Sequence, residues 1–289
     1  MAPFLSSLSH GGLARVNGLG GKPRKLIGDF RFRDQSTGQE FTYGQSSGNF
    51  FSDRRFDILG DAGAQAFVTI YVQANNGFTQ GRMLMTVGDT FSFRGDSSGN
   101  GQSYSAFMRG YRENTSISNS GSEIILLAAA RGASTCYGPG NAGFPSGSQG
   151  SGNGQPPGSQ FGWGGNGGGG SGGQTTGYLS GSGGIGGAFY SGPGGTPDNG
   201  GFLQGGYGGR PWFQGSGSEG GLGYYGGGGG GGGWAPGRGS GCPGGGGGGS
   251  NYVGGLPSGS PQGFIQVLSQ SSGTGGNQGR FFLDGIDPI

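Results

Sequence analysis

The first clear pattern along this chain is a set of short runs in which apolar and polar residues alternate. Segments 29–33, 39–43 and 56–59 each place apolar residues on one face at a period of two. That period is typical of strands with one face buried. We therefore predict three half-buried strands here, preceded by a polar, turn-rich arm over residues 1 to about 28.

A clearer strand pattern follows. Residues 66–72 form a β-rich run, Asn75-Asn76-Gly77 is a turn signal, and residues 81–87 form the next run. Gly88-Asp89 then turns into the run 90–93. The spacing predicts an antiparallel meander.

Two further runs frame the rest of the chain. The run 123–130 is continuously apolar after Glu123, as expected for a strand buried on both faces, and residues 263–268 form a closing strand. The intervening polar, serine-rich stretch that contains Tyr104, Phe107 and Tyr111 is interpreted as a loop. No helical periodicity of useful length occurs, so we expect almost no α-helix.

Between the two framing strands, the pattern is set by glycine. Most of the 83 glycines fall between Gly138 and Gly259, including eight in a row at Gly226–Gly233. Such a composition is typical of a flexible linker. Linkers lack large apolar residues, however, whereas this segment contains many Phe, Tyr and Trp residues that look spaced to pack.

The non-glycine residues recur every third position in several runs, among them 162–168, 183–188 and 205–210. A period of three matches the left-handed polyproline II type helix, which has no internal hydrogen bonds. If such helices are buried, their amides must pair with neighbours, and backbones approach closely only where side chains are absent. We therefore predict a bundle of polyglycine II helices with Gly226–Gly233 as an interior helix; a disordered tract is the alternative.

The predicted fold class is mainly β and irregular: a small antiparallel β-sheet with an inserted polyglycine II helix bundle. Strands enter and leave the bundle, which suggests an insertion tied at both ends to one sheet. We predict four regions. They are an arm and attachment region (1–55), a β-strand scaffold (56–135), the glycine-rich bundle (136–262), and a closing strand with a C-terminal tail (263–289).

Composition narrows the function. The formal net charge is +2 with 10% charged residues, which is no electrostatic footprint for nucleic acid. No stretch approaches the ~20 apolar residues that span a membrane, and the N-terminus lacks the pattern of a signal peptide. We expect a chain made in a cytoplasm that reaches outside surfaces as part of something larger. Cys136 and Cys242 flank the bundle; we favour two buried thiols over a disulfide.

The order of these features resembles a known domain. The step Thr86–Phe93, the strand Ile124–Ala130 and the glycine tract closing at Gly245–Val253 are similar to the glycine-rich domain of phage long-tail-fibre tip adhesins. The extracellular glycine-rich region of anaplastic lymphoma kinase-type receptors belongs to the same domain type. The resemblance implies a hexagonally packed polyglycine II bundle and, for the adhesins, receptor contact through loops between helices.

Enzymatic chemistry is not indicated. Two Gly-x-Ser-x-Gly matches, Gly44–Gly48 and Gly95–Gly99, lack a flanking helix pattern, and His10 is the only histidine that could act as a base. One histidine, two distant cysteines and unclustered carboxylates indicate no metal site, and no cofactor is expected.

The leading hypothesis is a non-enzymatic virion protein, the tip or knob of a tail fibre that binds a bacterial surface protein or glycan. The N-terminal region would attach to the fibre shaft or another virion protein, and a homotrimer is one alternative for assembly. Loop residues rich in binding hot-spot types are the receptor-binding candidates: Tyr207, Arg210, Trp212, Phe213, Trp234 and Arg238. A purely structural virion fibre, decoration or filament subunit is the alternative, and an ice-binding protein is a third.

Overall fold

The structure is a computed structural model. It describes residues 28–47, 52–95, 104–111, 124–134, 138–143, 147–150, 198–208, 219–224, 226–230, 245–253, 265–272 and 280–289. Within these ranges the regular elements are all strands, and no helix occurs. The mainly β fold class and the lack of α-helix in this part of the chain agree with the sequence-based expectation.

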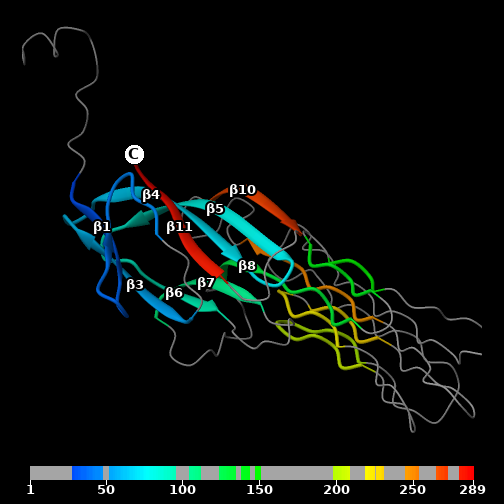
Figure 1. The fold of residues 1–289 in the computed structure, drawn as a ribbon. Coiled ribbons are helices and arrows are strands. Elements are labelled where there is room, and N and C mark those ends of the chain that lie inside the picture. The colour runs from blue at the N-terminus through cyan, green and yellow to red at the C-terminus, as the bar shows by residue number, and fades with distance from the viewer. Residues whose placement is uncertain are drawn as a thin grey trace, which may run out of the picture.

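The strands form two antiparallel sheets (Figure 1). The larger has the order β2-β1-β3-β6-β7-β8-β9. Its strands are β1 (Phe30–Asp34), β2 (Glu40–Phe41), β3 (Arg54–Gly60), β6 (Thr90–Gly95), β7 (Ser105–Arg109), β8 (Ile124–Ala128) and β9 (Tyr252–Val253). The smaller has the order β10-β5-β4-β11. Its strands are β4 (Gln65–Gln73), β5 (Gly77–Thr86), β10 (Ile265–Ser272) and β11 (Arg280–Pro288).

The two sheets enclose a core built on phenylalanine. Phe281 of β11 lies at its centre, with its ring centroid 5.1 Å from those of Phe56 and Phe93 and 5.4 Å from that of Phe107. Because Phe281 comes from the smaller sheet and the other three from the larger, these rings join the two layers. Offset ring pairs of this kind add to the stabilisation from burial alone.

Strand order corrects the predicted meander. β4 and β5 do pair, and their turn contains Asn76 at φ 76°, a conformation that asparagine tolerates. β6 instead pairs with β3 and β7, so the turn at Gly88-Asp89 crosses from the smaller sheet to the larger one.

The single-sheet expectation is also wrong. β8, which leads into the glycine-rich segment, lies in the larger sheet, whereas β10, which follows that segment, pairs with β5 in the smaller one. The stretch interpreted as a polar loop contains β7, which is buried at four of its five positions. The strand predicted over 123–130 is confirmed as β8, buried on both faces.

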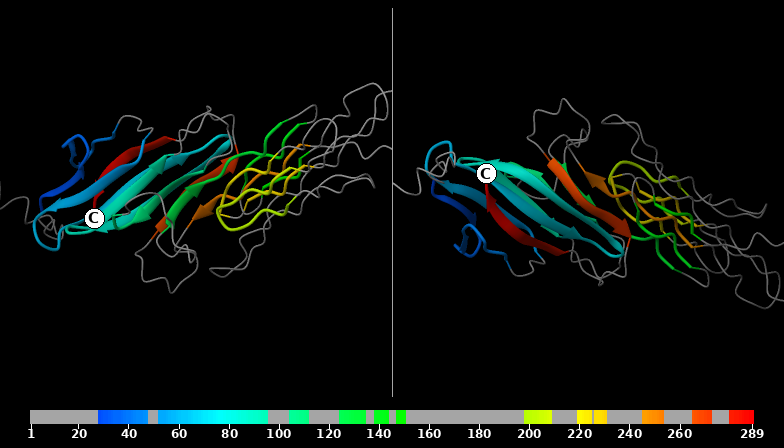
Figure 2. Two further views of the ribbon diagram at one scale, coloured as in Figure 1. Left: turned by 90° about the horizontal axis from the view of Figure 1, so that it is seen from below. Right: turned by 90° about the horizontal axis from the view of Figure 1, so that it is seen from above.

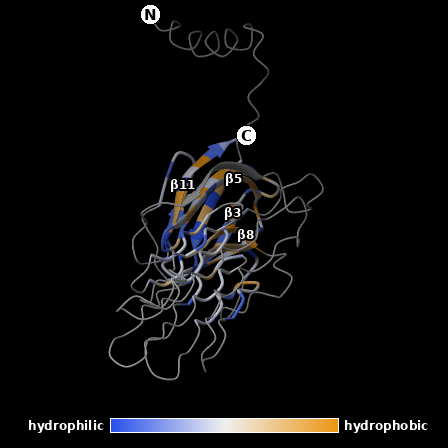
Figure 3. Ribbon diagram, turned by 90° about the vertical axis from the view of Figure 1, so that its right-hand side faces the viewer, coloured by the Kyte–Doolittle hydropathy of each residue, from blue (hydrophilic) through white to orange (hydrophobic). Residues whose placement is uncertain are grey.

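The described glycine-rich segments leave the β-sandwich from one end and run side by side (Figures 1 and 2). Hydropathy separates the two regions: the labelled strands show hydrophobic colour, and the glycine segments are nearly white (Figure 3). Most of the described glycine-rich residues therefore have no apolar side chain with which to pack.

Candidate functional site: the glycine bundle and its junction with the sandwich

Segment 245–250 lies at the centre of the described glycine-rich region. All six of its residues are buried although five are glycines. It exchanges backbone hydrogen bonds with five other described segments, namely 130–134, 138–143, 147–150, 219–224 and 226–230. The backbone itself is the packing surface here.

The direction of these hydrogen bonds returns every third residue. Gly246 N and Gly249 N donate to segment 130–134, at Ala133 O (3.1 Å) and Ala130 O (3.0 Å). Gly247 N instead donates to Gly228 O at 2.9 Å.

The carbonyl groups follow the same rule. Gly246 O and Gly249 O both accept from segment 138–143, from Gly140 N at 2.8 Å and Gly143 N at 3.2 Å. A strand ladder alternates between two opposite directions, whereas a three-residue return is what the predicted helix with three residues per turn would give.

Glycine is required at these positions because of close approach. A Cβ atom added at Gly246 would lie under 3.0 Å from Glu219 O, and one added at Gly229 would meet Tyr207 O equally closely. The obstacles are backbone atoms, which cannot rotate away. Gly201 differs, because an added Cβ there would come no closer than 4.0 Å to Gln204 Cβ.

The octaglycine run is partly described, and Gly226–Gly230 are all buried. Gly226 N and Gly229 N both donate to segment 198–201, at Gly201 O (2.8 Å) and Asp198 O (3.0 Å). The predicted interior position holds for these five residues, and segment 245–250 shares it.

Asn251 ties the glycine segments to both sheets. Its Oδ1 accepts from Ala129 N at 2.7 Å beside β8, and its Nδ2 donates to Phe78 O of β5 at 3.2 Å. Asn251 is fully buried. A buried amide with both ends bonded fixes orientation strongly, because losing either partner leaves a backbone group unsatisfied.

A second apolar cluster fills the junction on the outer face of the larger sheet. The rings of Tyr224 and Tyr252 stack at 3.9 Å between centroids, and Phe202 meets Tyr224 edge-on at 5.1 Å. Both tyrosines are 1% exposed. These rings therefore pack, as the aromatic content of the segment predicted.

Tyr207 is the one receptor-binding candidate among the described residues. It is 58% exposed, and Gln204, three positions earlier, is also exposed, while Gly206 between them is buried. In this pair, exposed side chains thus lie three positions apart. The other candidates, Arg210, Trp212, Phe213, Trp234 and Arg238, lie outside the described residues, as do Cys136 and Cys242.

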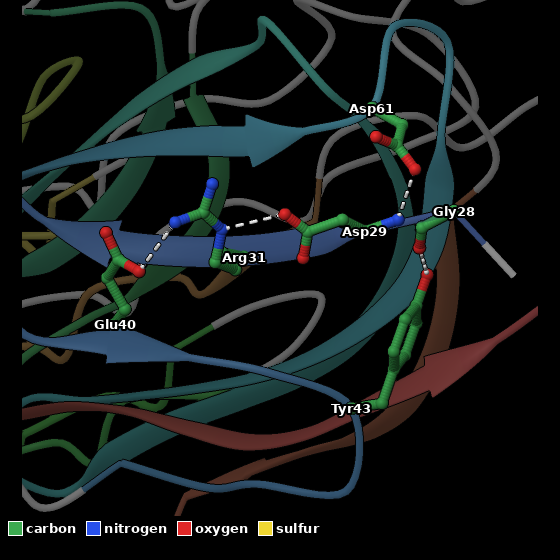
Figure 4. Close-up of polar contacts among 6 residues, drawn as sticks. All are labelled: Gly28, Asp29, Arg31, Glu40, Tyr43 and Asp61. Carbon is green, nitrogen blue, oxygen red and sulfur yellow. Dashed lines mark hydrogen bonds and ion pairs between the residues drawn. The ribbon is translucent and has the colours of Figure 1, made fainter.

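At the opposite end of the sandwich, a polar cluster fixes the start of β1 (Figure 4). Arg31 lies between Asp29 and Glu40, with Nε 3.1 Å from Asp29 Oδ2 and Nη1 3.0 Å from Glu40 Oε2. Asp29 N donates to Asp61 Oδ2 at 2.8 Å, and Tyr43 donates its hydroxyl to Gly28 O at 3.1 Å.

The hydrogen bond to Glu40, followed by the charge of Asp29, raises the pKa of Arg31. Burial, followed by nearby carboxylates, raises the pKa of the Tyr43 hydroxyl. Both groups thus keep their ordinary protonation states at neutral pH. The cluster holds the start of β1 in place.

A cavity of about 500 Å³ lies on the larger sheet, where it is lined by strands β3, β6 and β7 and by neighbouring loop residues. Its lining comes from the turn after β1, from the start of β3, from β6, and from the end of β7: Gln35, Ser36, Asp53, Arg54, Arg55, Ser92, Phe93, Arg94, Met108 and Tyr111. The sequence analysis singled out none of its arginines. Arg54 and Arg55 come from β3 and Arg94 comes from β6, so only the fold brings the arginines of the two strands together.

No family model, curated protein or solved structure matches this chain. The described residues contain no group of three or more His, Cys, Asp and Glu side chains that could hold a metal ion. No helix in the described part of the chain is long and apolar enough to cross a membrane.

Proposed function

We propose that the chain is a non-enzymatic virion protein, the tip or knob of a tail fibre, which recognises a bacterial surface through loops carried on a polyglycine II bundle. The observation that carries this proposal is the central segment 245–250. Its backbone is bonded on all sides with a three-residue return, and glycine is sterically required there.

Rigidity links this architecture to recognition. A segment whose N–H groups are paired at four consecutive residues, Gly246 to Gly249, cannot rearrange without breaking several hydrogen bonds together, so the loops it carries start from fixed positions. Binding residues are commonly presented on loops held by a rigid scaffold. Pre-positioned contacts also lose less entropy on binding.

The flank of the bundle supports the same interpretation. Exposed large apolar residues are few in the described part, and Tyr207 is among them. Its segment continues into the stretch that contains Arg210, Trp212 and Phe213. Tyrosine, tryptophan and arginine are the residue types most enriched at binding hot spots.

A purely structural virion subunit is the second candidate. It is favoured by the packing of Phe202, Tyr224 and Tyr252 into the junction, where these rings serve cohesion. An aromatic residue in a glycine-rich segment is therefore not by itself a binding residue, and function has to separate the two roles.

Particle adsorption separates the two candidates. Virions carrying Trp212→Ala should assemble normally and adsorb to host cells about tenfold more slowly, since hot-spot residues contribute about 2 kcal/mol or more. Trp234→Ala should have a smaller effect, and Gln204→Ala is the matched exposed control. Normal adsorption by both tryptophan variants would favour the structural subunit.

A further inference from the structure

The cavity at the larger sheet combines features of a binding site that the bundle does not share. Its volume of about 500 Å³ falls within the range typical of small-molecule sites. It lies in the sandwich, and β3 and β6 supply half of its lining residues. A function for it is thus independent of the loops proposed to contact a host.

Charge is the first such feature. Arg54, Arg55 and Arg94 line the cavity against one carboxylate in the lining, Asp53, whose Oδ1 accepts from Gly95 N at 3.1 Å. Asp34 lies behind Arg54, fully buried, with its Oδ2 3.3 Å from Arg54 Nη1. Asp34 also accepts hydrogen bonds from Ser36 N and Thr37 Oγ1. Positive charge therefore exceeds negative charge around the cavity.

Aromatic rings orient two of these arginines. The guanidinium carbon of Arg94 lies 5.2 Å from the ring centroid of Tyr104, and Arg94 Nη1 donates to the Tyr104 hydroxyl at 2.9 Å. The guanidinium carbon of Arg55 lies 5.9 Å from the ring centroid of Tyr111. Stacking uses the face of a guanidinium, whereas carboxylate and phosphate recognition uses its N–H edge.

The rest of the wall suits a hydroxylated ligand. Gln35 Nε2 donates to the Tyr111 hydroxyl at 3.3 Å, and this hydrogen bond connects two residues of the cavity lining. Ser36 and Ser92 add short polar groups, and the Tyr111 ring, 41% exposed, offers an apolar face. An aromatic face beside amide and hydroxyl groups is the combination that binds a sugar ring.

We propose that this cavity binds an acidic saccharide, a sugar that bears a carboxylate or phosphate group. Arg55 and Arg94 hold the anionic group, and the Tyr111 ring covers the sugar face. The cavity is a second recognition site, and it operates whether or not the bundle loops contact a host.

Calorimetric titration of the purified full chain tests the site with four probes: glucuronic acid, glucose 6-phosphate, glucose and inorganic phosphate. The two acidic sugars should bind about tenfold more tightly than glucose, because a charge-assisted hydrogen bond contributes about twice as much as a neutral one. Glucuronic acid against glucose 6-phosphate distinguishes carboxylate from phosphate recognition. Inorganic phosphate binding as tightly as either sugar would overturn the saccharide assignment.

Variants connect any binding to the cavity. Arg55→Gln and Arg94→Gln should each weaken acidic-sugar binding about tenfold and leave glucose unchanged. Arg31→Gln, at a strand arginine outside the cavity, is the control and should bind normally. Gln35→Glu, at an exposed position in the mouth, should repel the acidic sugars and keeps the test valid if an arginine variant fails to fold. Equal binding of acidic and neutral sugars, or unchanged binding by all the cavity variants, would overturn the proposal.

Discussion

The sandwich and the glycine bundle both have a closely packed interior, but the interiors are built in opposite ways. In the sandwich, large rings such as those of Phe107 and Phe281 fill the space between the two sheets. In the bundle, segment 245–250 meets its neighbours through bare backbone. One region depends on side chains being present, and the other on their being absent.

Glycine content alone therefore does not indicate disorder. Ordering glycine costs more conformational entropy than ordering other residues, so each bundle segment needs compensation from its surroundings. Hydrogen bonding on several sides supplies it, together with the dense contact that missing side chains permit. The junction cluster around Tyr224 and Tyr252 then joins the two kinds of core.

The largest loss of stability is expected when a core side chain of the sandwich is removed. Phe281→Ala leaves a cavity among three neighbouring rings and should lower the free energy of unfolding by about 3–5 kcal/mol. Chemical denaturation monitored by fluorescence measures the change. Leu84→Ala, at a partly exposed position of β5, is the control, and an equal loss in both variants would contradict a core centred on Phe281.

The second prediction breaks the bundle by adding a side chain. Gly246→Ala places a methyl group against the backbone at Glu219 O and should cost about 1–3 kcal/mol or more, as overpacking does. Gly229→Ala, against Tyr207 O, should behave similarly.

Gly201→Ala is the matched control for both glycine variants. The space at Gly201 admits a Cβ at ordinary contact distance, so little change is expected there. Identical melting temperatures for Gly246→Ala and Gly201→Ala would mean that the glycine segments are not packed as described.

The third prediction concerns the connection between the two regions. Asn251→Ala leaves Ala129 N and Phe78 O without their side-chain partner and should cost about 1–3 kcal/mol. Gln80→Ala, which removes an exposed hydrogen bond to Asp284, should cost little. Hydrogen exchange that rises only in the glycine segments of Asn251→Ala would localise its effect to the junction, whereas a uniform rise would contradict a localised anchor.

Two kinds of strand were predicted correctly from the sequence: strands with one face in the core, which alternate, and β8, which is continuously apolar and buried on both faces. The residues of segments 29–33 and 56–59 alternate because one sheet face meets phenylalanine and the other is partly exposed. β7 was missed because both of its faces are buried and Ser105 lies among its buried residues, which hides the alternation. β11 was missed because Asp284, Gly285 and Pro288 are uncommon in strands. A register shift between Leu283 and Gly285 leaves Asp284 out of the pairing with β4.

Local sequence patterns could not predict which sheet each strand joins, nor that arginines from β3 and β6 line one cavity. The turn at Gly88-Asp89 has the same residues whether the next strand pairs or crosses to another sheet. Arg54 and Arg94 are 40 positions apart in the sequence, and antiparallel pairing of β3 with β6 brings them together. The glycine period, by contrast, was readable because each segment repeats the same local requirement every three residues.

The smallest change in stability is expected for a substitution at Leu203, a leucine within the glycine-rich region. Leu203 and Leu222 are both partly buried against the junction cluster, but only Leu203 has a positive φ, 56°. A left-handed conformation costs a non-glycine residue about 1–2 kcal/mol, and glycine does not incur that cost. Leu203→Gly therefore loses apolar contact while relieving backbone strain, and should change stability by less than about 1 kcal/mol. Leu222→Gly loses similar contact without that relief and should be the more destabilised of the two in a thermal melt. If Leu203→Gly were instead the less stable variant, its side chain would matter more than its backbone, and position 203 would belong with the sandwich rather than with the bundle.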